Sequence, residues 1–393
     1  MTKLKIALLS LMLAGAVQAE SLHLTIVSTP QQREDLTSFS GIVVEERRAL
    51  ERAIKLALDE AKLKFDLYGI EPQLKTIEID PAQPIEQQLS DLDANHLLLL
   101  DLPANLLKTA ANYADKLDAV AINTSASEQS LRSDLCLPGV YHAIPSDRMY
   151  FDALAQFLVH SGWLKVLLVH GSSERDMERK TILAESIERF GGSISDERIF
   201  TLSHHPDDRD RNKPEFLTGR SSYDVVAVID SELDFGRRIQ FSTRRPRPVV
   251  GDVGLVPKAW HYALERYGAP QLNERYRNLG STESSARLAM TDREFAAWAS
   301  VKFVANSLNP THLTGDGLNL RSLFEDKESR VDLYKGTRGS FRYWNHQMRQ
   351  PILLATENYV SDIAPMPKFL HPTHYTDTLG EDQPESTCQH PLR

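Results

Sequence analysis

The chain has 393 residues, a formal net charge of −9, 41% hydrophobic residues and only two cysteines. An acidic chain is a poor match for nucleic acid or for anionic membrane surfaces. Its length is too great for one hydrophobic core and predicts two domains of ordinary size, and no internal repeat or low-complexity tract interrupts it.

The first nineteen residues have the pattern of a secretory signal peptide. Lys3 and Lys5 precede an apolar run over 6–17, and Val-Gln-Ala ends at Ala19. The run is shorter than the roughly 20 apolar residues of a membrane span. We therefore expect cleavage after Ala19 and export of the remaining chain. Residues 1–19 hold two lysines and no acidic residue, so cleavage takes the formal charge from −9 to −11.

The two cysteines are Cys136 and Cys388, and they fit neither a CxxC redox motif nor a zinc knuckle. In an oxidising compartment an even pair indicates a disulfide. An intrachain bond would connect the start of "CLPGVYHAIPSDRMY" to the C-terminal segment. Two free thiols or an intermolecular bridge are the alternatives.

Strands and helices alternate through the first 143 residues. Strands are predicted at "LHLTIVS" (22–28), "QLKTIEI" (73–79), "HLLLLDL" (96–102) and "DAVAIN" (118–123). Helical patterns fill the gaps: an apolar repeat over 50–61, a proline-led segment at 84–93, and a stretch through Leu106 and Tyr113.

The same alternation resumes after residue 146. Ser146 is placed to cap a helix that ends at Gly162, and a second helix carries Leu183 and Ile187. Strands are predicted at 164–170, 223–230 and 247–253. Because alternating strands and helices require crossover connections, the pattern predicts an α/β fold of mostly parallel sheets covered by helices on both faces. Such sheets bind ligands at the carboxyl ends of their strands.

The later chain is dominated by other elements. A helix is predicted around "AWHYALERY" (259–267), and a capping box from Thr291 to Glu294 predicts the start of another. "GTRGSFRYWNHQMRQPILLAT" (336–356) has the pattern of a β-hairpin with a turn near Asn345 and His346.

The order of these elements, with "GVYHAIPSDRMYFDALAQFLVHSGWLKVLLVHGSS", "RFGGSI", "YDVVAVID" and the late hairpin, resembles the type I periplasmic substrate-binding proteins of ABC transporters, such as the branched-chain amino acid receptors. "RPRPVVGDVGLVPKAWH", "RQPILLAT" and "TLGEDQPESTC" resemble a subgroup associated with pyrroloquinoline quinone-dependent alcohol dehydrogenase systems. The resemblance implies two Rossmann-like α/β lobes joined by a three-segment hinge. Lobe 1 would comprise 21–143 and 254–330, and lobe 2 would comprise 144–253 and 331–361. A C-terminal tail, 362–393, would be tied to lobe 1 by the disulfide.

The resemblance also implies where a ligand would bind. In "NTSASEQ", the hydroxyls of Thr124, Ser125 and Ser127 are candidates for a ligand carboxylate, with a plain helix cap as the alternative. Asp252, in "VVGDVG", matches the acid that receives a ligand ammonium in these receptors, although Gly-Asp pairs are also common in turns.

Two departures from the receptors concern the same site. The receptors have a loop containing glycine and serine after the third strand, whereas this chain has the apolar "DLPAN" (101–105), stiffened by Pro103. In addition, "HGSSERDM" places Arg175 and Asp176 where the receptors have Tyr-Gly. A guanidinium there favours a carboxylate, a phosphate or another acidic ligand, or it pairs with nearby acids. Ser172 in the same loop and Asp230 at the end of "YDVVAVID" complete the set of candidate ligand-binding residues.

A segment rich in arginine, "GRRIQFSTRRPRP" (236–248), carries five arginines near the strand ends of lobe 2. A solvated or ion-paired face is the favoured interpretation, and an acidic ligand or a partner-docking surface is the alternative. No four-ligand zinc spacing and no G-x-S-x-G nucleophile motif occur, so neither a metal, a cofactor nor an enzyme activity is expected.

Taken together, the sequence predicts a monomeric periplasmic solute-binding protein that closes two lobes on a small acidic or polar ligand and presents it to an ABC transporter permease. The subgroup resemblance links it to quinoprotein alcohol oxidation. The alternative is an accessory or sensor protein of a quinoprotein dehydrogenase system that uses the same fold without transport.

Overall fold

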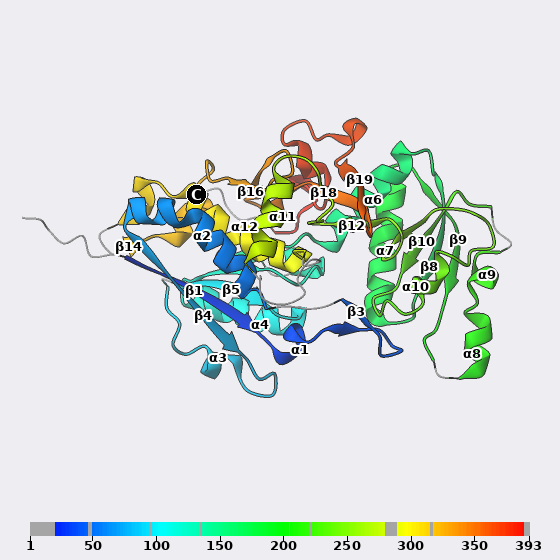
Figure 1. Cartoon of the computed structure of the whole chain (residues 1–393), viewed down its shortest axis with the longest axis horizontal. Coiled ribbons are helices and arrows are strands. Elements are labelled where there is room, and N and C mark those ends of the chain that lie inside the picture. The colour runs from blue at the N-terminus through cyan, green and yellow to red at the C-terminus, as the bar shows by residue number, and fades with distance from the viewer. Residues whose placement is uncertain are drawn as a thin grey trace, which may run out of the picture.

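The computed structural model describes residues 20–45, 49–94, 96–133, 136–203, 205–219, 222–279, 289–314 and 317–388. The predicted signal peptide, residues 1–19, lies outside this range. Two α/β units lie at opposite ends of the molecule, and a small sheet lies between them (Figure 1). We call the unit around the sheet that contains the first strand lobe 1, and the other unit lobe 2.

The sheet of lobe 1 is parallel throughout, as the alternating pattern predicts. Its order in the described residues is β4-β1-β5-β6-β7. The bounds are β1 Glu20–Ser28, β4 Ile70–Glu78, β5 His96–Asp101, β6 Val120–Asn123 and β7 Val140–His142.

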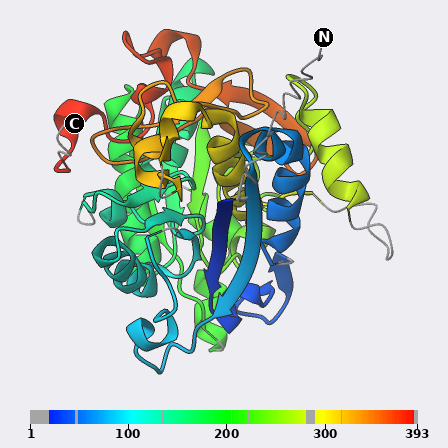
Figure 2. The same ribbon diagram turned by 90° about the vertical axis from the view of Figure 1, so that its left-hand side faces the viewer.

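Helices cover both faces of this sheet. Leu24, Leu97 and Leu99 point to the face packed by α2 (Glu51–Tyr68), α11 (Ala269–Asn278) and α12 (Asp292–Ser307). Leu98 and Leu100, one residue out of phase, pack with α3 (Ile85–Gln88) and α4 (Ala104–Lys116) on the other face. Figure 2 shows the strands of lobe 1 between these two helical layers. The uninterrupted apolar run of β5 is explained by burial on both faces.

The sheet of lobe 2 is also parallel, in the order β11-β10-β8-β9 among the described residues. Its bounds are β8 Lys165–His170, β9 Ser193–Ile199, β10 Val225–Ile229 and β11 Val249–Gly251. The helices α6 (Asp147–His160) and α7 (Glu174–Arg189) pack on one face, and α10 (Gly236–Ile239) lies by the other. Ser146 caps α6 as predicted, since its hydroxyl accepts a hydrogen bond from the Met149 amide.

A three-stranded antiparallel sheet, β12-β18-β19, joins the lobes; its bounds are β12 Val256–Lys258, β18 Ile352–Thr356 and β19 Tyr359–Ala364. Successive side chains of β18 belong to different cores. Leu353 packs in the core of lobe 1, whereas Ile352 and Leu354 pack in the core of lobe 2. Because successive side chains of a strand point to opposite faces, β18 contributes to the cores of both lobes.

A buried lysine connects the chain segments that run between the lobes. The Lys335 ammonium donates hydrogen bonds to the carbonyls of Ala259 and Pro351 and to Gln350 Oε1, at 2.8–3.0 Å. The Gln350 amide in turn donates to the Ala143 carbonyl at 2.8 Å. Burial lowers the pKa of Lys335 to about 7. These bonds hold the three crossings together at one place.

The remaining elements are short. They are α1 Pro30–Arg33, α5 Ser130–Ser133, α8 Pro206–Arg211, α9 Pro214–Leu217, α13 Leu320–Glu325, β2 Leu36–Thr37, β3 Val43–Glu45, β13 Leu313–Thr314, β14 Gly317–Leu318, β15 Val331–Asp332, β16 Arg338–Phe341 and β17 Met348–Arg349. The resemblance places 331–361 in lobe 2, but Val331, Leu333 and Met348 pack in the core of lobe 1. We therefore group 331–349 with lobe 1.

Two sequence expectations in the later chain differ from the structure. The predicted helix over 259–267 is wrong: these residues form turns, and α11 begins only at Ala269. Tyr267 and Gly268 both have positive φ, and Trp260 is held instead by hydrogen bonds to Asp292 and Asn273. The predicted hairpin is confirmed for β16 and β17, but the chain then leaves it, and β18 pairs with β12 and β19.

Candidate ligand-binding cleft

A cavity of about 330 Å³ lies where the two lobes face each other. Several of its residues lie in the loops that follow parallel strands: Asp230 directly after β10, Asp252 directly after β11, and Ser127 four residues after the end of β6. This is the edge of such sheets at which ligands bind. The full lining is Leu36, Ser127, Asp147, Tyr150, Arg175, Arg179, Asp230, Ser231, Leu233, Asp252, Val256, Pro257, Lys258 and Asp292.

Arg175, in the first turn of α7, links the lobes across this cavity. Its Nη2 donates hydrogen bonds to Ser127 Oγ of lobe 1 at 3.0 Å and to Asp147 Oδ2 at 2.5 Å. Its Nη1 donates to Glu178 at 2.9 Å. The Ser127 hydroxyl itself donates to Asp147 Oδ1 at 3.0 Å. The guanidinium therefore pairs with acids of the protein, which is the second of the two outcomes expected from the sequence.

Arg179 lies one helical turn after Arg175 and pairs with Asp252. Its two terminal nitrogens donate to the two carboxylate oxygens of Asp252 at 2.6 Å each. The guanidinium also lies over the ring of Phe151, 5.2 Å from the ring centroid. Asp252 is thus occupied by a cation of the protein in the place where the resemblance puts a ligand ammonium.

Asp230 is fully buried, yet one of its carboxylate oxygens has no hydrogen-bond partner among the described residues. The other oxygen accepts the Gly236 amide at 2.7 Å. Burial, reinforced by the carboxylates of Asp252, Asp176 and Asp234 against that amide bond, raises the pKa of Asp230 to about 6. A buried oxygen on the cavity wall without a partner is an acceptor available to a ligand.

Two further contacts close the cleft. The Tyr150 hydroxyl of α6 donates to Asp292 Oδ2 at the start of α12, at 2.7 Å. The Ser40 hydroxyl, between β2 and β3, donates to Asp234 of lobe 2 at 2.7 Å. Figure 1 shows the segment of β3 reaching from lobe 1 toward lobe 2. These two hydrogen bonds therefore join the lobes directly.

The structure brings together four of the seven candidate residues. Ser127, Arg175, Asp230 and Asp252 line the cavity, whereas Thr124, Ser125 and Ser172 do not. The hydroxyls of Thr124 and Ser125 donate instead to the carbonyls of Leu100 and Leu102, and Ser172 is exposed outside the cavity lining.

Sequence reasoning missed Asp147, Tyr150, Arg179, Lys258 and Asp292. Two local signals were available. Asp147 follows the capping residue of α6, and Arg179 stands four residues after Arg175, which places both arginines on one helix face. Among the described residues, no group of three His, Cys, Asp or Glu side chains is arranged to hold a metal ion.

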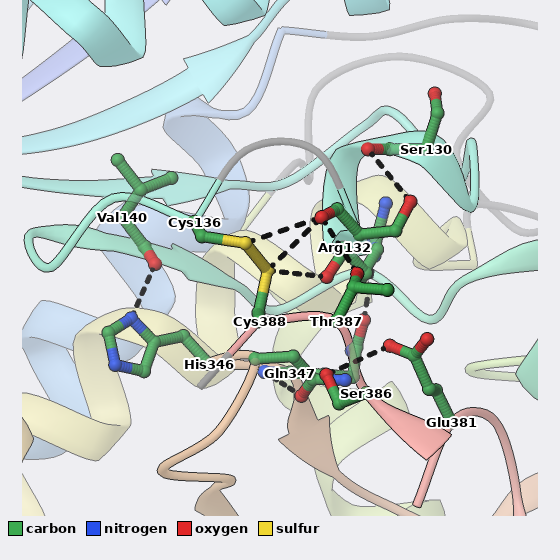
Figure 3. The surroundings of a disulfide bond; sticks show 12 residues. Ser130, Arg132, Cys136, Val140, His346, Gln347, Glu381, Ser386, Thr387 and Cys388 are labelled. Carbon is green, nitrogen blue, oxygen red and sulfur yellow. Dashed lines mark hydrogen bonds between the residues drawn. A yellow bond between two sulfur atoms is a disulfide. The ribbon is translucent and has the colours of Figure 1, made fainter. Parts of the chain in front are cut away.

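The expected disulfide between Cys136 and Cys388 is confirmed, with 5.4 Å between the two Cα atoms (Figure 3). The tail, however, packs mainly on lobe 2. Met366 and Leu379 belong to the lobe 2 core, and the Gly380 amide donates to Asp152 of α6 at 2.8 Å. Its end then crosses to the Cys136 loop of lobe 1, where Thr387 donates to the Ser133 carbonyl. The tail is therefore a fourth, covalently closed connection between the lobes.

This connection lies beside the hinge. The Arg132 guanidinium donates to the Ile144 carbonyl in the first crossing and to Gln347 Oε1 before the third, at 2.8–2.9 Å. The Cys388 sulfur lies 3.1 Å from the Arg132 carbonyl. A link close to the rotation axis is displaced less by lobe closure than one at the cleft mouth.

Comparisons with known proteins agree with this architecture. No protein-family model matches the sequence, and no curated protein matches it either. Solved structures do match. A branched-chain amino acid ABC transporter periplasmic ligand-binding protein from Burkholderia xenovorans has a TM-score of 0.69 at 10% identity, covering 93% of this chain and 99% of that chain.

Two more solved structures match over nearly the whole chain. A leucine-, isoleucine-, valine-, threonine- and alanine-binding protein from Brucella ovis, in a closed conformation, has a TM-score of 0.69 at 11% identity over 95% of this chain and 100% of that one. A solute-binding protein of an ABC transporter from R. palustris, in complex with benzoate, has a TM-score of 0.61 at 10% identity over 94% and 99%. Identities this low establish the fold alone. The chain has the two-lobed α/β fold of type I periplasmic binding proteins.

Proposed function

We propose that this protein is the periplasmic solute-binding component of an ABC transporter and that it closes its two lobes on a small ligand. The observation that carries the proposal is the cleft itself, where Ser127 and Asp292 of lobe 1 face Arg175, Asp230 and other residues of lobe 2 around one cavity. The likeness to solved binding proteins supports the assignment of a transport role, with a membrane permease as partner.

The ligand we propose is small and polar, with an acidic group and a hydrogen-bond donor. Lys258 lines the cavity, and no salt bridge reaches its ammonium from the described residues, so it can pair with a ligand acid. The unpartnered oxygen of Asp230 can accept a bond from a ligand hydroxyl or amine. Arg175 and Arg179 also line the cavity, but their guanidinium groups already pair with Asp147 and Asp252. The cleft therefore differs from one built around an unpaired guanidinium.

Native mass spectrometry of the protein purified from its own periplasm, without refolding, tests the proposal by identifying a retained small molecule. The compound found is then titrated into ligand-free protein by calorimetry. Lys258→Met and Asp230→Asn should each weaken binding by about tenfold or more, since each removes one polar contact. Ser172→Ala is the matched control, because Ser172 is exposed outside the cavity lining. Equal effects of all three variants would argue against this cleft.

The second candidate is a sensor or accessory protein of a quinoprotein alcohol dehydrogenase system. Its structural support is the internal pairing of the cleft arginines together with the disulfide-closed tail between the lobes. The link to pyrroloquinoline quinone-dependent oxidation rests on the strings "RPRPVVGDVGLVPKAWH", "RQPILLAT" and "TLGEDQPESTC". Co-purification of a dehydrogenase or cytochrome, with no small molecule retained, would favour this role over transport.

The remaining parts of the proposal concern export and assembly. We propose a periplasmic monomer whose leader is cleaved after Ala19, without catalytic activity of its own. Among the described residues no helix combines the length and apolar character that a membrane span requires. Amino-terminal sequencing of the exported protein and light scattering of the purified chain check the cleavage site and the monomer.

A further inference from the structure

The segment rich in arginine between β10 and β11 forms a basic surface on lobe 2. Arg237 is paired, since it bonds Asp234 at 2.6 Å and the Leu233 carbonyl at 3.0 Å. Arg244, Arg245 and Arg247 are exposed, and within the part of the chain that the structure describes no salt bridge reaches them. The positive charges of these three side chains are therefore available to a binding partner.

The backbone holds this loop in a defined conformation. The Arg244 amide donates to Thr218 Oγ1 at 2.7 Å, and the Thr243 hydroxyl donates to the Arg245 carbonyl at 2.7 Å. Ile239, just before the loop, is fully buried in the lobe 2 core. The three arginines therefore extend from a loop whose backbone is already fixed, which reduces the conformational entropy lost when a partner binds.

An apolar groove of about 780 Å³ adjoins the basic loop. Arg247 lies in its lining, and Phe241 and Tyr359 stand at it with 85% and 63% of their surface exposed. A contiguous exposed apolar patch with polar residues at its rim is typical of an interaction site. The apolar side chains of the groove include Phe157, Trp163, Phe241, Val253, Leu255 and Tyr359, and the carboxylate-bearing Glu357 also lines it, on a different chain segment from Arg247.

We propose that this groove and the arginines 244, 245 and 247 together bind an acidic, apolar-containing segment of a partner protein. Carboxylates of such a segment would pair with the guanidinium groups, and its apolar side chains would fill the groove. The charge of the whole chain, −9, opposes adsorption to extended anionic polymers or membranes, whereas three local positive charges suit a short acidic segment. The described linings of the groove and of the cleft share only Val256, so this surface is separate from the ligand site.

A synthetic twelve-residue peptide that alternates Glu with Leu and Phe is the probe, measured by fluorescence anisotropy with the full mature chain. We expect binding that weakens as salt is raised. The triple variant R244E/R245E/R247E should lose about tenfold or more in affinity, and Phe241→Ser should lose affinity while the salt dependence is kept. Thermal unfolding of each variant checks that it is folded.

Matched controls separate this site from general charge attraction. The triple variant K55E/K75E/K327E makes the same charge change at exposed lysines of lobe 1 and should bind the peptide as the wild type does. A polyglutamate peptide without apolar residues should bind more weakly than the probe. Equal losses in the two triple variants, equal binding of polyglutamate, or tighter binding to phosphatidylglycerol vesicles than to the peptide would each overturn the proposal.

Discussion

The Arg179 guanidinium and the Asp252 carboxylate form a bidentate salt bridge, with both nitrogen–oxygen distances at 2.6 Å. Asp252 also accepts the Asp230 amide at 2.8 Å, so this carboxylate organises the loops after β10 and β11. The protein thus supplies its own cation at the position where the sequence resemblance to the amino acid receptors places a ligand ammonium. Any ligand ammonium would have to displace Arg179 or bind elsewhere in the cleft.

Replacement of Arg179 by methionine should lower the free energy of unfolding by about 2 to 4 kcal/mol, because it leaves the largely buried Asp252 carboxylate without its partner. The double variant Arg179→Met/Asp252→Asn should recover part of this loss. Denaturant titrations measure both. Lys180→Met is the control on the same helix, where the partner Glu197 is half exposed and the expected loss is below about 1 kcal/mol. Similar losses in the two single variants would contradict the structural role of the pair.

Replacement of Tyr150 by phenylalanine should favour the open arrangement of the lobes. It removes the 2.7 Å hydrogen bond to Asp292 between lobe 2 and lobe 1, a change of about 1 kcal/mol in the closing equilibrium. Small-angle scattering of the ligand-free protein should show a larger radius of gyration. Tyr223→Phe removes a 2.7 Å bond to the Thr218 carbonyl within lobe 2 and should leave the scattering unchanged. An expansion in both variants would mean that Tyr150 has no special part in closure.

Asp230 should make the protein less stable as the pH rises from about 4 to about 6. Its pKa is raised to about 6 in the folded state, against about 3.9 in the unfolded chain, so in this window the folded protein binds a proton that the unfolded chain has released. Relative to Asp230→Asn, the wild type should lose roughly 2 kcal/mol across the window and remain flat above it. Denaturant titrations from pH 4 to 8 measure the difference. Parallel curves for the two proteins would rule out a raised pKa.

Comparison with the asparagine variant also separates Asp230 from a second acid. Burial raises the pKa of Asp152 to about 6 as well, against the influence of Arg189 and Arg148. Asp152 is present in both proteins, so its contribution cancels in the difference.

Removal of the disulfide should loosen the end of the tail. The bond spans 252 residues of sequence, and in Cys136→Ser/Cys388→Ser its loss should cost roughly 2 to 5 kcal/mol of unfolding free energy. Hydrogen exchange should increase at 382–388 but little at 364–380, since Arg342 and Arg349 still pair with Asp377. Asp377→Asn is the reciprocal control and should loosen the middle of the tail while its end stays bonded. Uniform loosening of the whole tail in the cysteine variant would show that the bridge alone holds it.

Local signals predicted most of the fold because their physics lies within a few residues. The hydroxyl of Ser146 caps α6, and the reciprocal bonds of Thr291 and Glu294 begin α12, as the sequence indicates. The helix predicted at 259–267 does not form: Tyr267 and Gly268 have positive φ, and the Trp260 indole donates to the Asn273 side chain, which lies thirteen residues further along the chain. At the site, Arg175 was predicted from its loop, whereas its bonds to Ser127 and Asp147 join parts of the chain up to 48 residues apart.

The sequence by itself determined the α/β class and the alternation of strands and helices, and it favoured an intrachain bond between the two cysteines, because periodicity, caps and cysteine number are local or compositional properties. Only the tertiary structure decided which acids neutralise the cleft arginines, which Asp230 oxygen lacks a partner, and that the tail packs on lobe 2 before it is bonded to lobe 1. These features depend on distances between side chains that are remote in sequence. Coulombic and hydrogen-bond energies change steeply over a few ångströms, so no local pattern encodes them.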